Sequence, residues 1–117
     1  MEPLLTIGIT SYKRVQELKR CINSISTKFV EDIEILVSED KSPLSIEIGE
    51  MVNELASNSK YNIRFSTNAV NLGYDGNLGA IIEKSKGKFI FFMSDDDALY
   101  ENCLDFIIPV LKEDQTH

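Results

Sequence analysis

Four short apolar runs alternate with longer segments in which apolar residues recur every three or four positions, and this alternation limits the folds open to the chain. The runs occupy residues 4–10, 33–38, 62–67 and 88–94, and they are rich in β-branched or aromatic residues. The first and last are apolar almost throughout, as is typical of strands covered on both faces. The segments with helical spacing carry Val15, Leu18, Ile22 and Ile25; Ile48, Met51, Val52 and Leu55; Leu78, Ile81 and Ile82; and Leu104, Ile107 and Ile108.

The repeated order of strand and helix predicts an α/β domain with a mostly parallel sheet in α/β/α layers. Right-handed crossovers give a Rossmann-like half whose strands, numbered along the chain, take the order 3-2-1-4. Pro109 is expected to kink or end the last helix. No linker, repeat or low-complexity tract divides residues 1–117, so we expect a single domain.

The charge balance argues against some partners and sets a condition on others. Acidic side chains number 19 and basic ones 12, giving a formal net charge of −7. We therefore expect no nucleic-acid partner, because phosphate backbones need a basic face. A phosphorylated ligand would need a metal ion or a local group of Lys and Arg. The chain shows neither a signal peptide nor a membrane-spanning stretch, so we expect a cytoplasmic protein, with peripheral docking at the inner face of a membrane left open. Cys21 and Cys103 are expected to be free thiols.

Polar and acidic clusters follow three of the predicted strands. In a sheet of this kind, ligands bind beyond the carboxyl ends of the strands, at the point where the strand order reverses. That point lies between the first and fourth strands, which are followed by TSYKR (10–14) and SDDDAL (94–99). The second strand, next to the first, is followed by SEDKS (38–42). We therefore expect at least five carboxylates to converge on one edge of the sheet.

The acidic residues in these clusters allow two interpretations each. Asp95, Asp96 and Asp97 either lie on a solvated turn that caps the next helix or hold a cation that offsets their repulsion. Carboxylates suit Mg²⁺ or Mn²⁺, which proteins hold by one or two such groups together with substrate phosphates. Glu39 and Asp40 fit either a surface turn or a carboxylate that accepts hydrogen bonds from a nucleobase or ribose.

The residues after the first strand are similarly open. Thr10 or Ser11 could cap the first helix. In a binding site, Tyr12 would stack on a nucleobase and Arg14 would pair with a phosphate, and the sequence fits this interpretation equally well.

The glycines of NAVNLGYDGNLGAII (68–82) do not form a known phosphate loop. Gly73, Gly76 and Gly79 are spaced G-x-x-G-x-x-G and follow the third strand, so both the dinucleotide fingerprint and the nucleotide-triphosphatase loop are poor matches. The simpler interpretation is a glycine-assisted turn with Asp75 or Asn77 at the start of a helix, whose N–H groups are free for a ligand.

In this order, TIGITSYKR, ILVSEDKS and NAVNLGYDGNLGAIIEKSKGKFIFFMSDDDALY resemble the nucleotide-binding half of glycosyltransferase family 2, the inverting enzymes with the GT-A fold. The resemblance covers nearly the whole chain and implies a nucleotide-sugar donor. The residues that it assigns to the donor are Thr10 and Tyr12 in the nucleotide pocket, Arg14 at a common basic position, Asp40 on the base with Glu39 beside it, Asn71, Gly73, Asn77 and Gly79 approaching the sugar nucleotide, and Asp95 near the ribose. It implies a Mn²⁺ or Mg²⁺ cofactor with Asp96 as its main ligand and Asp97 in support.

Two positions depart from the family pattern. Ser94 stands where many members carry the first Asp of the acidic motif, and Gly76 stands where an Arg is usual. The first departure implies coordination by fewer carboxylates, and the second removes a contact to the diphosphate.

The activity that the resemblance implies is inverting sugar transfer to a glycan or lipid-linked acceptor in polysaccharide biosynthesis. A general base would deprotonate the acceptor hydroxyl while the metal stabilises the departing nucleoside diphosphate. Family members continue well beyond this length, with an acceptor-binding half that supplies the base. We therefore expect residues 1–117 to be a donor-binding fragment that is inactive alone. Two rivals are a Mg²⁺-dependent phosphohydrolase, with Asp95 and Asp97 as nucleophile and acid, and a non-catalytic binding or assembly module of the same fold.

Overall fold

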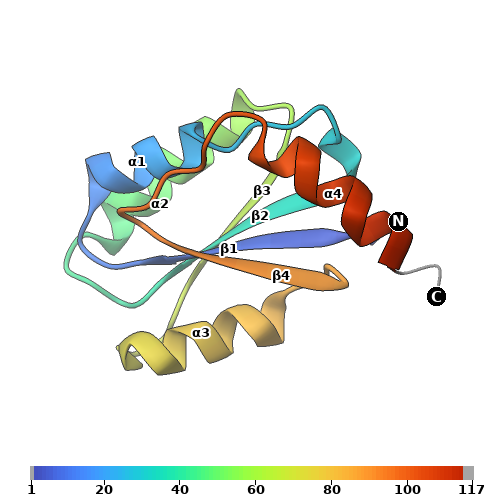
Figure 1. Cartoon of the computed structure of the whole chain (residues 1–117). Helices are drawn as coiled ribbons and strands as arrows, with labels where there is room; N and C mark the ends of the chain where they lie inside the picture. Colours follow the sequence, from blue (N-terminus) through green and yellow to red (C-terminus); the bar gives the residue numbers. More distant parts are fainter. Residues whose placement is uncertain (1, 115–117) are drawn as a thin grey trace.

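The computed structural model describes residues 2–114, in which four parallel strands form one sheet of order β3-β2-β1-β4 (Figure 1). The strands are β1 (Leu5–Ser11), β2 (Ile33–Glu39), β3 (Asn62–Thr67) and β4 (Phe89–Ser94). The predicted order of strands is thus confirmed, and the sheet is parallel throughout. Since β1 lies between β2 and β4, the reversal of strand order falls between β1 and β4 as expected.

Helices cover both faces of the sheet and complete the predicted α/β/α layers (Figure 1). Three of them lie on one face: α1 (Val15–Asn23), α2 (Ser45–Ser57) and α4 (Cys103–Asp114). Among the described residues, α3 (Gly73–Lys84) alone covers the opposite face. A 3-10 turn, η1 (Val30–Asp32), precedes β2.

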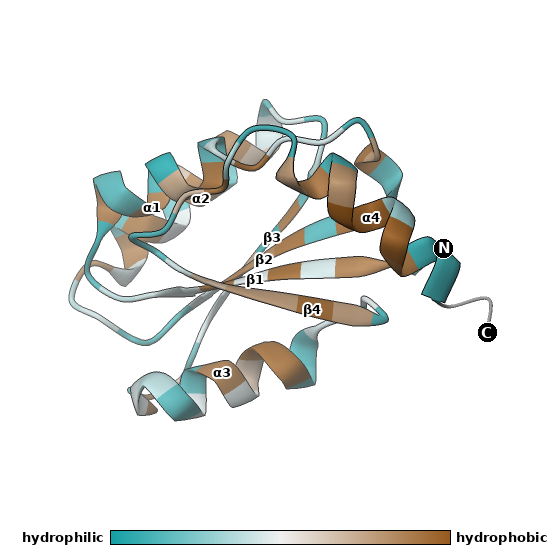
Figure 2. Cartoon of the chain, in the orientation of Figure 1, coloured by the Kyte–Doolittle hydropathy of each residue, from teal (hydrophilic) through white to brown (hydrophobic). Residues whose placement is uncertain are grey.

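Alternate residues of each strand divide the sheet into two unlike faces. Ile7, Ile35 and Phe91 are in register, and their side chains belong to the hydrophobic core under α1, α2 and α4. The other face is more polar: Thr6 and Glu34 are fully buried there. Figure 2 shows the strands mostly hydrophobic, with hydrophilic residues gathered on the outer parts of the helices and in the loops. The main core therefore lies on the three-helix side.

A single glycine sets how closely α3 approaches this polar face. A Cβ added at Gly8 of β1 would lie 2.5 Å from Cγ2 of Ile81, a fully buried residue of α3. Real carbon atoms do not approach that closely, so the helix can pack at its present distance only because position 8 has no side chain.

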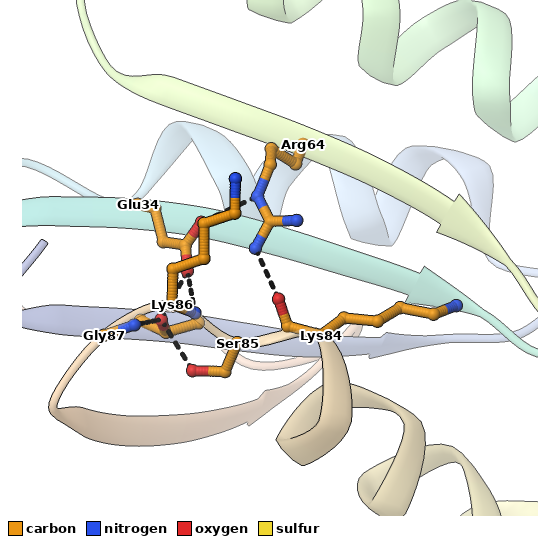
Figure 3. Close-up of polar contacts among 7 residues, drawn as sticks. Glu34, Arg64, Lys84, Ser85, Lys86 and Gly87 are labelled. Carbon is orange, nitrogen blue, oxygen red and sulfur yellow. Dashed lines mark hydrogen bonds and ion pairs between the residues drawn. The ribbon is translucent and has the colours of Figure 1, made fainter. Parts of the chain in front are cut away.

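The fully buried carboxylate of Glu34 fixes the carboxyl end of α3 (Figure 3). It accepts hydrogen bonds from Oγ1 of Thr6 at 2.6 Å, from Nε of Arg64 at 2.7 Å and from the N–H of Lys86 at 2.8 Å. Arg64 also donates to the carbonyl of Lys84, the last residue of α3. Burial disfavours the charged form of Glu34, but these hydrogen bonds outweigh it and hold the pKa of Glu34 below its ordinary value.

Some local expectations differ from the structure. Pro109 lies inside α4, which continues to Asp114 because Leu104 and Ile108 remain fully buried on its inner side. Neither Thr10 nor Ser11 caps α1, whose cap position is taken by Arg14 without a side-chain hydrogen bond.

Both cysteines are free thiols, as expected. Cys21 is buried, and burial together with the nearby aspartates after β4 raises its pKa to about 12. No helix within residues 2–114 combines the length and the apolar character needed to cross a membrane.

Candidate functional site

A cavity of about 590 Å³ opens where β1 and β4 end, beside the start of α3. This is the edge of the sheet at which the strand order reverses. The lining includes nine of the residues expected at the site: Thr10, Tyr12, Arg14, Asp40, Asn71, Gly73, Asn77, Asp95 and Asp96. Glu39 and Asp97 also follow strands that end at this edge but lie outside the cavity, so three of the five carboxylates expected at the edge line it.

The turn after β1 carries two of these residues and is tied to the turn after β4. The N–H of Tyr12 donates to Oδ2 of Asp95 at 2.9 Å. Lys13 has a left-handed backbone with a φ of 64°, which turns the chain into α1. Its ammonium lies 5.4 Å from the centre of the Tyr12 ring, and 42% of Tyr12 is exposed. The ring is therefore available to a ligand.

Ser11 lines the same cavity, although sequence reasoning did not place it there. Only 1% of Ser11 is exposed, and its hydroxyl has no hydrogen-bond partner among the described residues. A buried hydroxyl without a partner costs free energy, and a water or ligand atom at the cavity would satisfy it. The available signal was its position between Thr10 and Tyr12 at a strand end, where a polar side chain has no packing role.

Asp95 and Asp96 follow β4 and lie in unlike surroundings. Asp95 is 5% exposed, and this burial raises its pKa above the ordinary value although the Tyr12 N–H and Arg14 oppose the shift. The side chain of Asp96 is 51% exposed, and its Oδ2 forms a salt bridge with Nη1 of Arg14 at 2.8 Å. That hydrogen bond holds the pKa of Asp96 below its ordinary value.

Asp97 has a local role. Its carboxylate accepts a hydrogen bond from the N–H of Ser94 at 2.8 Å, and its own N–H donates to the Ser94 carbonyl at 3.0 Å. Asp97 therefore closes the turn that holds Asp95 and Asp96 beside the cavity. A phosphohydrolase would need both Asp95 and Asp97 to face its substrate, and this geometry does not support that rival.

The pair of acids at the cavity matches the way proteins hold Mg²⁺ or Mn²⁺ with a phosphorylated ligand. Residues 2–114 contain no group of three or more His, Cys, Asp or Glu side chains that could hold a metal on their own. Mg²⁺ is commonly held by one or two carboxylates together with substrate phosphates, rather than by a cage made only of protein groups. Asp96, half exposed at the cavity, and Asp95 beside it supply that number of oxygen donors.

Asp40 organises the start of α3. Its carboxylate accepts hydrogen bonds from the N–H groups of Leu72 at 2.8 Å and Gly73 at 3.0 Å. Asn68 donates to the same carboxylate at 2.9 Å. These bonds satisfy free N–H groups at the start of the helix, and the φ of 78° at Gly73 requires glycine in this tight entry. One carboxylate thus shapes the loop and also lines the cavity.

Asn77 holds the next turn of α3 against β2. Only 2% of it is exposed, its Nδ2 donates to the Ser38 carbonyl at 2.9 Å, and its Oδ1 accepts from the Ser38 hydroxyl at 2.6 Å. It lies within the helix rather than at its start. Asp75 lies in the first turn of α3, whose cap position, Leu72, makes no side-chain hydrogen bond.

Glu39 faces away from Asp40 and serves α2. Its carboxylate accepts hydrogen bonds from the Ser42 N–H at 3.0 Å and from the Ser45 hydroxyl at 2.6 Å. Successive residues of a strand point to opposite faces, so the last residue of β2 is directed to the three-helix side. This placement does not support the expected position of Glu39 beside the base, because its carboxylate is used in the turn before α2.

Comparison with known proteins identifies the family of this chain. A model of the family described as "Glycosyl transferase family 2" matches residues 6–117. The chain belongs to glycosyl transferase family 2. The expectation drawn from its ordered motifs is confirmed.

Two curated members of family 2 illustrate the similarity. Abequosyltransferase RfbV of Salmonella typhimurium is 34% identical over 103 residues, which cover 86% of this chain and 30% of that protein. The GalNAc(5)-diNAcBac-PP-undecaprenol beta-1,3-glucosyltransferase of Campylobacter jejuni is 27% identical over 115 residues, covering 98% of this chain and 37% of that protein. The chain thus spans about a third of the length of these relatives.

Solved structures show the same fold. TarS of S. aureus, residues 1–349, matches 94% of this chain with a TM-score of 0.78 and 19% identity, over 32% of its own length. Mannosyltransferase PcManGT from Pyrobaculum calidifontis, solved in complex with GDP-Man and Mn²⁺, matches 89% of the chain with a TM-score of 0.79 and 13% identity, over 31% of its own length. At such identities the likeness concerns the fold, which is the GT-A fold expected from the sequence.

Proposed function

We propose that this family 2 chain is the donor-binding part of a metal-dependent, inverting glycosyltransferase. The observation that carries the proposal is one cavity lined by an arginine, two neighbouring carboxylates and a serine whose buried hydroxyl has no partner among the described residues. Such a cavity offers hydrogen bonds, a cation and metal-binding oxygens to the same ligand. A nucleoside diphosphate carrying a sugar uses all three.

The residues of the cavity divide between the parts of that ligand. Thr10, Ser11 and the half-exposed ring of Tyr12 face the nucleoside, and Asp40 accepts hydrogen bonds from the base. Asn71, Gly73 and Asn77, in the first turns of α3 or just before it, lie on the side of the sugar nucleotide. Arg14 pairs with the diphosphate.

Asp96 is the main metal ligand in this proposal, Asp95 lies near the ribose, and Asp97 supports both through the turn that it closes. A bound Mn²⁺ or Mg²⁺ would supply positive charge that stabilises the departing nucleoside diphosphate. The neighbour crystallised with GDP-Man and Mn²⁺ supports this choice of cofactor. Sugar transfer with inversion needs one further group, a base that removes the proton of the acceptor hydroxyl.

We assign that base and the acceptor-binding half to polypeptide beyond these 117 residues, because the relatives matched are about three times as long. The acceptor is proposed to be a glycan or a lipid-linked glycan at the cytoplasmic face of a membrane. The relative whose name includes PP-undecaprenol motivates that choice. Transfer of labelled sugar to water-soluble acceptors only, with none to a polyprenyl-diphosphate glycan, would argue against a lipid-linked acceptor.

Isothermal titration calorimetry tests the donor site directly. The chain is titrated with UDP, GDP, CDP and ADP, each with and without MnCl₂, and the best nucleotide is repeated as its sugar conjugates. We expect one nucleotide to bind with a Kd that falls on addition of Mn²⁺. The absence of Mn²⁺-dependent binding of any of the four would overturn the proposal. Binding that is equal for all four bases would favour a non-catalytic module with an unselective pocket.

A further inference from the structure

Arg14 already occupies the oxygens that a metal ion would need. Its Nη1 lies 2.8 Å from Oδ2 of Asp96 and 3.8 Å from Oδ1 of Asp95. These are the two acids of the β4 turn that line the cavity. A guanidinium and a divalent cation carry charge of the same sign, so they cannot both lie against the Asp96 carboxylate without strong repulsion.

The two partners differ in how easily they can release the arginine. Asp95 is buried and anchored by the Tyr12 N–H, whereas the side chains of Arg14 and Asp96 are 48% and 51% exposed. Arg14 is the cap residue of α1, with an extended backbone and no capping bond from its side chain. Its guanidinium can therefore move by side-chain rotation alone, without a change in the helix.

A second feature of the cavity points to a ligand independently of these charges. Ser11 lines the cavity, and its buried hydroxyl has no hydrogen-bond partner within the described part of the chain. The ion pair of Arg14 and Asp96 thus lies at the edge of a site that is built to receive further polar atoms.

We propose that Arg14 is an exchangeable counter-ion for the acids of the β4 turn. Without ligand it neutralises Asp96. When a divalent cation binds together with a nucleoside diphosphate, Asp96 would release Arg14 and coordinate the cation. The guanidinium of Arg14 would then form its ion pair with the diphosphate oxygens. The inference rests on the proposed function and adds a consequence to it: metal and nucleotide bind with positive coupling, because each relieves the cost that the other meets.

The exchange predicts opposite effects of removing Arg14 on the two ligands. In Arg14→Ala, Mn²⁺ alone should bind about tenfold more tightly than to the wild type, because its competitor is gone. The nucleoside diphosphate should bind about tenfold more weakly in the presence of Mn²⁺. The factor by which nucleotide tightens Mn²⁺ binding should therefore fall. Arg14→Lys keeps the charge and should retain most of that coupling.

The measurement is the concentration of free Mn²⁺ by electron paramagnetic resonance, with MnCl₂ alone and with the nucleoside diphosphate that binds best. Arg20→Ala is the matched control, since it removes the same charge from an exposed position on α1 outside the cavity. It should behave as the wild type. Unchanged thermal unfolding of each variant shows that the fold is intact.

Two results separate failure of this inference from failure of the proposed function. If the wild type shows Mn²⁺-dependent nucleotide binding but Arg14→Ala binds Mn²⁺ alone no more tightly than Arg20→Ala, the exchange is overturned and the donor site stands. If the wild type binds nucleotide equally well without Mn²⁺, Arg14 is a permanent substitute for the metal. Both the exchange and the metal-dependent function are then overturned.

Discussion

Asp95 and Asp96 are adjacent in the chain, yet their carboxylates differ in nearly every physical property. Burial raises the pKa of Asp95, whereas the Arg14 hydrogen bond lowers that of Asp96. The first is held by a backbone N–H, and the second is half exposed in an ion pair with Arg14. Asp96 is therefore the acid that can exchange its partner, and Asp95 is the one that fixes the geometry around it.

This difference predicts the result of Asp96→Asn. The variant should lose Mn²⁺-dependent nucleotide binding, because a neutral amide is a poor ligand for a hard cation. Its melting temperature should stay close to that of the wild type, since an exposed ion pair contributes little to stability. Calorimetry and thermal unfolding measure the two effects. Glu54→Gln, which removes an exposed charge on α2, serves as the control. Retention of Mn²⁺-dependent binding by Asp96→Asn would remove Asp96 from the metal site.

Glu34 gives a prediction for the dependence of stability on pH. Its pKa is depressed in the folded state, so its ionised form stabilises the fold above the ordinary pKa of about 4.3, and this contribution is lost as the pH falls further. Glu34→Gln should lower the free energy of unfolding by about 2 kcal/mol near neutral pH, because hydrogen bonds to a charged group are lost.

The difference between wild type and Glu34→Gln should then shrink as the pH falls below about 4.3. Urea denaturation at a series of pH values measures it, with the exposed Glu50→Gln of α2 as a control that should show little difference throughout. A wild-type advantage that stays constant down to strongly acidic pH would contradict an ionised, hydrogen-bonded Glu34.

At the level of single residues, the sequence predicted which side chains lie near the cavity where their position at the end of a strand decides it. The acids and hydroxyls after β1 and β4 were predicted to meet, and the cavity contains all of them except Asp97. Glu39 and Asp40 were not separated, because one step along a strand reverses the direction of the side chain and the sequence does not show which face α3 will cover. Ser11 was assigned only a possible capping role for the same reason.

Among the elements, α3 is fixed at both ends by side chains of β2, of the residue after it and of β3. Glu34, with Arg64 and Lys86, holds its carboxyl end, while Ser38 and Asp40 hold its first turns through side-chain hydrogen bonds. The helix start that lines the cavity is therefore positioned by the sheet and not by α3's own capping, which lacks a side-chain hydrogen bond.

Gly8→Ala should disturb this element and the cavity together. The added methyl group would meet Ile81 at 2.5 Å, so α3 must move outward, and such overpacking costs about 1–3 kcal/mol. Urea denaturation should show that loss, and the Kd of the nucleoside diphosphate should rise because α3 carries part of the lining.

Gly79→Ala provides the matched comparison on α3 itself. A Cβ there meets nothing within 4 Å, so the substitution should stabilise the helix by about 0.5–1 kcal/mol. Equal stability of the two variants would show that the close contact between β1 and α3 does not limit the packing.

The elements themselves could be predicted largely from periodicity. All four strands occur within one residue of their expected positions, since runs of β-branched and aromatic residues have few other solutions in an α/β chain. The network of Glu34, Thr6 and Arg64 was not predicted. Its members lie on three different strands, and only the register of the sheet brings them together. Pro109 was expected to kink or end α4; the helix does not end there, because burial of Leu104 and Ile108 outweighs the lost hydrogen bond.

At the scale of the whole molecule, donor binding and sugar transfer should be separable. The 117-residue chain contains the proposed donor site, whereas the relatives are about three times as long. We expect the chain to bind its nucleotide but to transfer no sugar to an acceptor. A longer polypeptide that carries the acceptor-binding half should restore transfer. Nucleoside diphosphate release, coupled to an enzymatic assay, measures this. Turnover by the 117 residues alone would place the base within them.

The cavity is lined by two kinds of residue, and this has an evolutionary consequence. The side chains of Tyr12 and Arg14 are exposed and hold no helix in place, whereas those of Asp40 and Asn77 also hold α3. We therefore expect selection on the first pair to act through ligand binding alone, and selection on the second pair to persist even in a descendant that has lost activity. A mutational scan that scores abundance and nucleotide binding separately should show this division. Substitutions of Tyr12 and Arg14 would lower binding alone, and those of Asp40 and Asn77 would lower both.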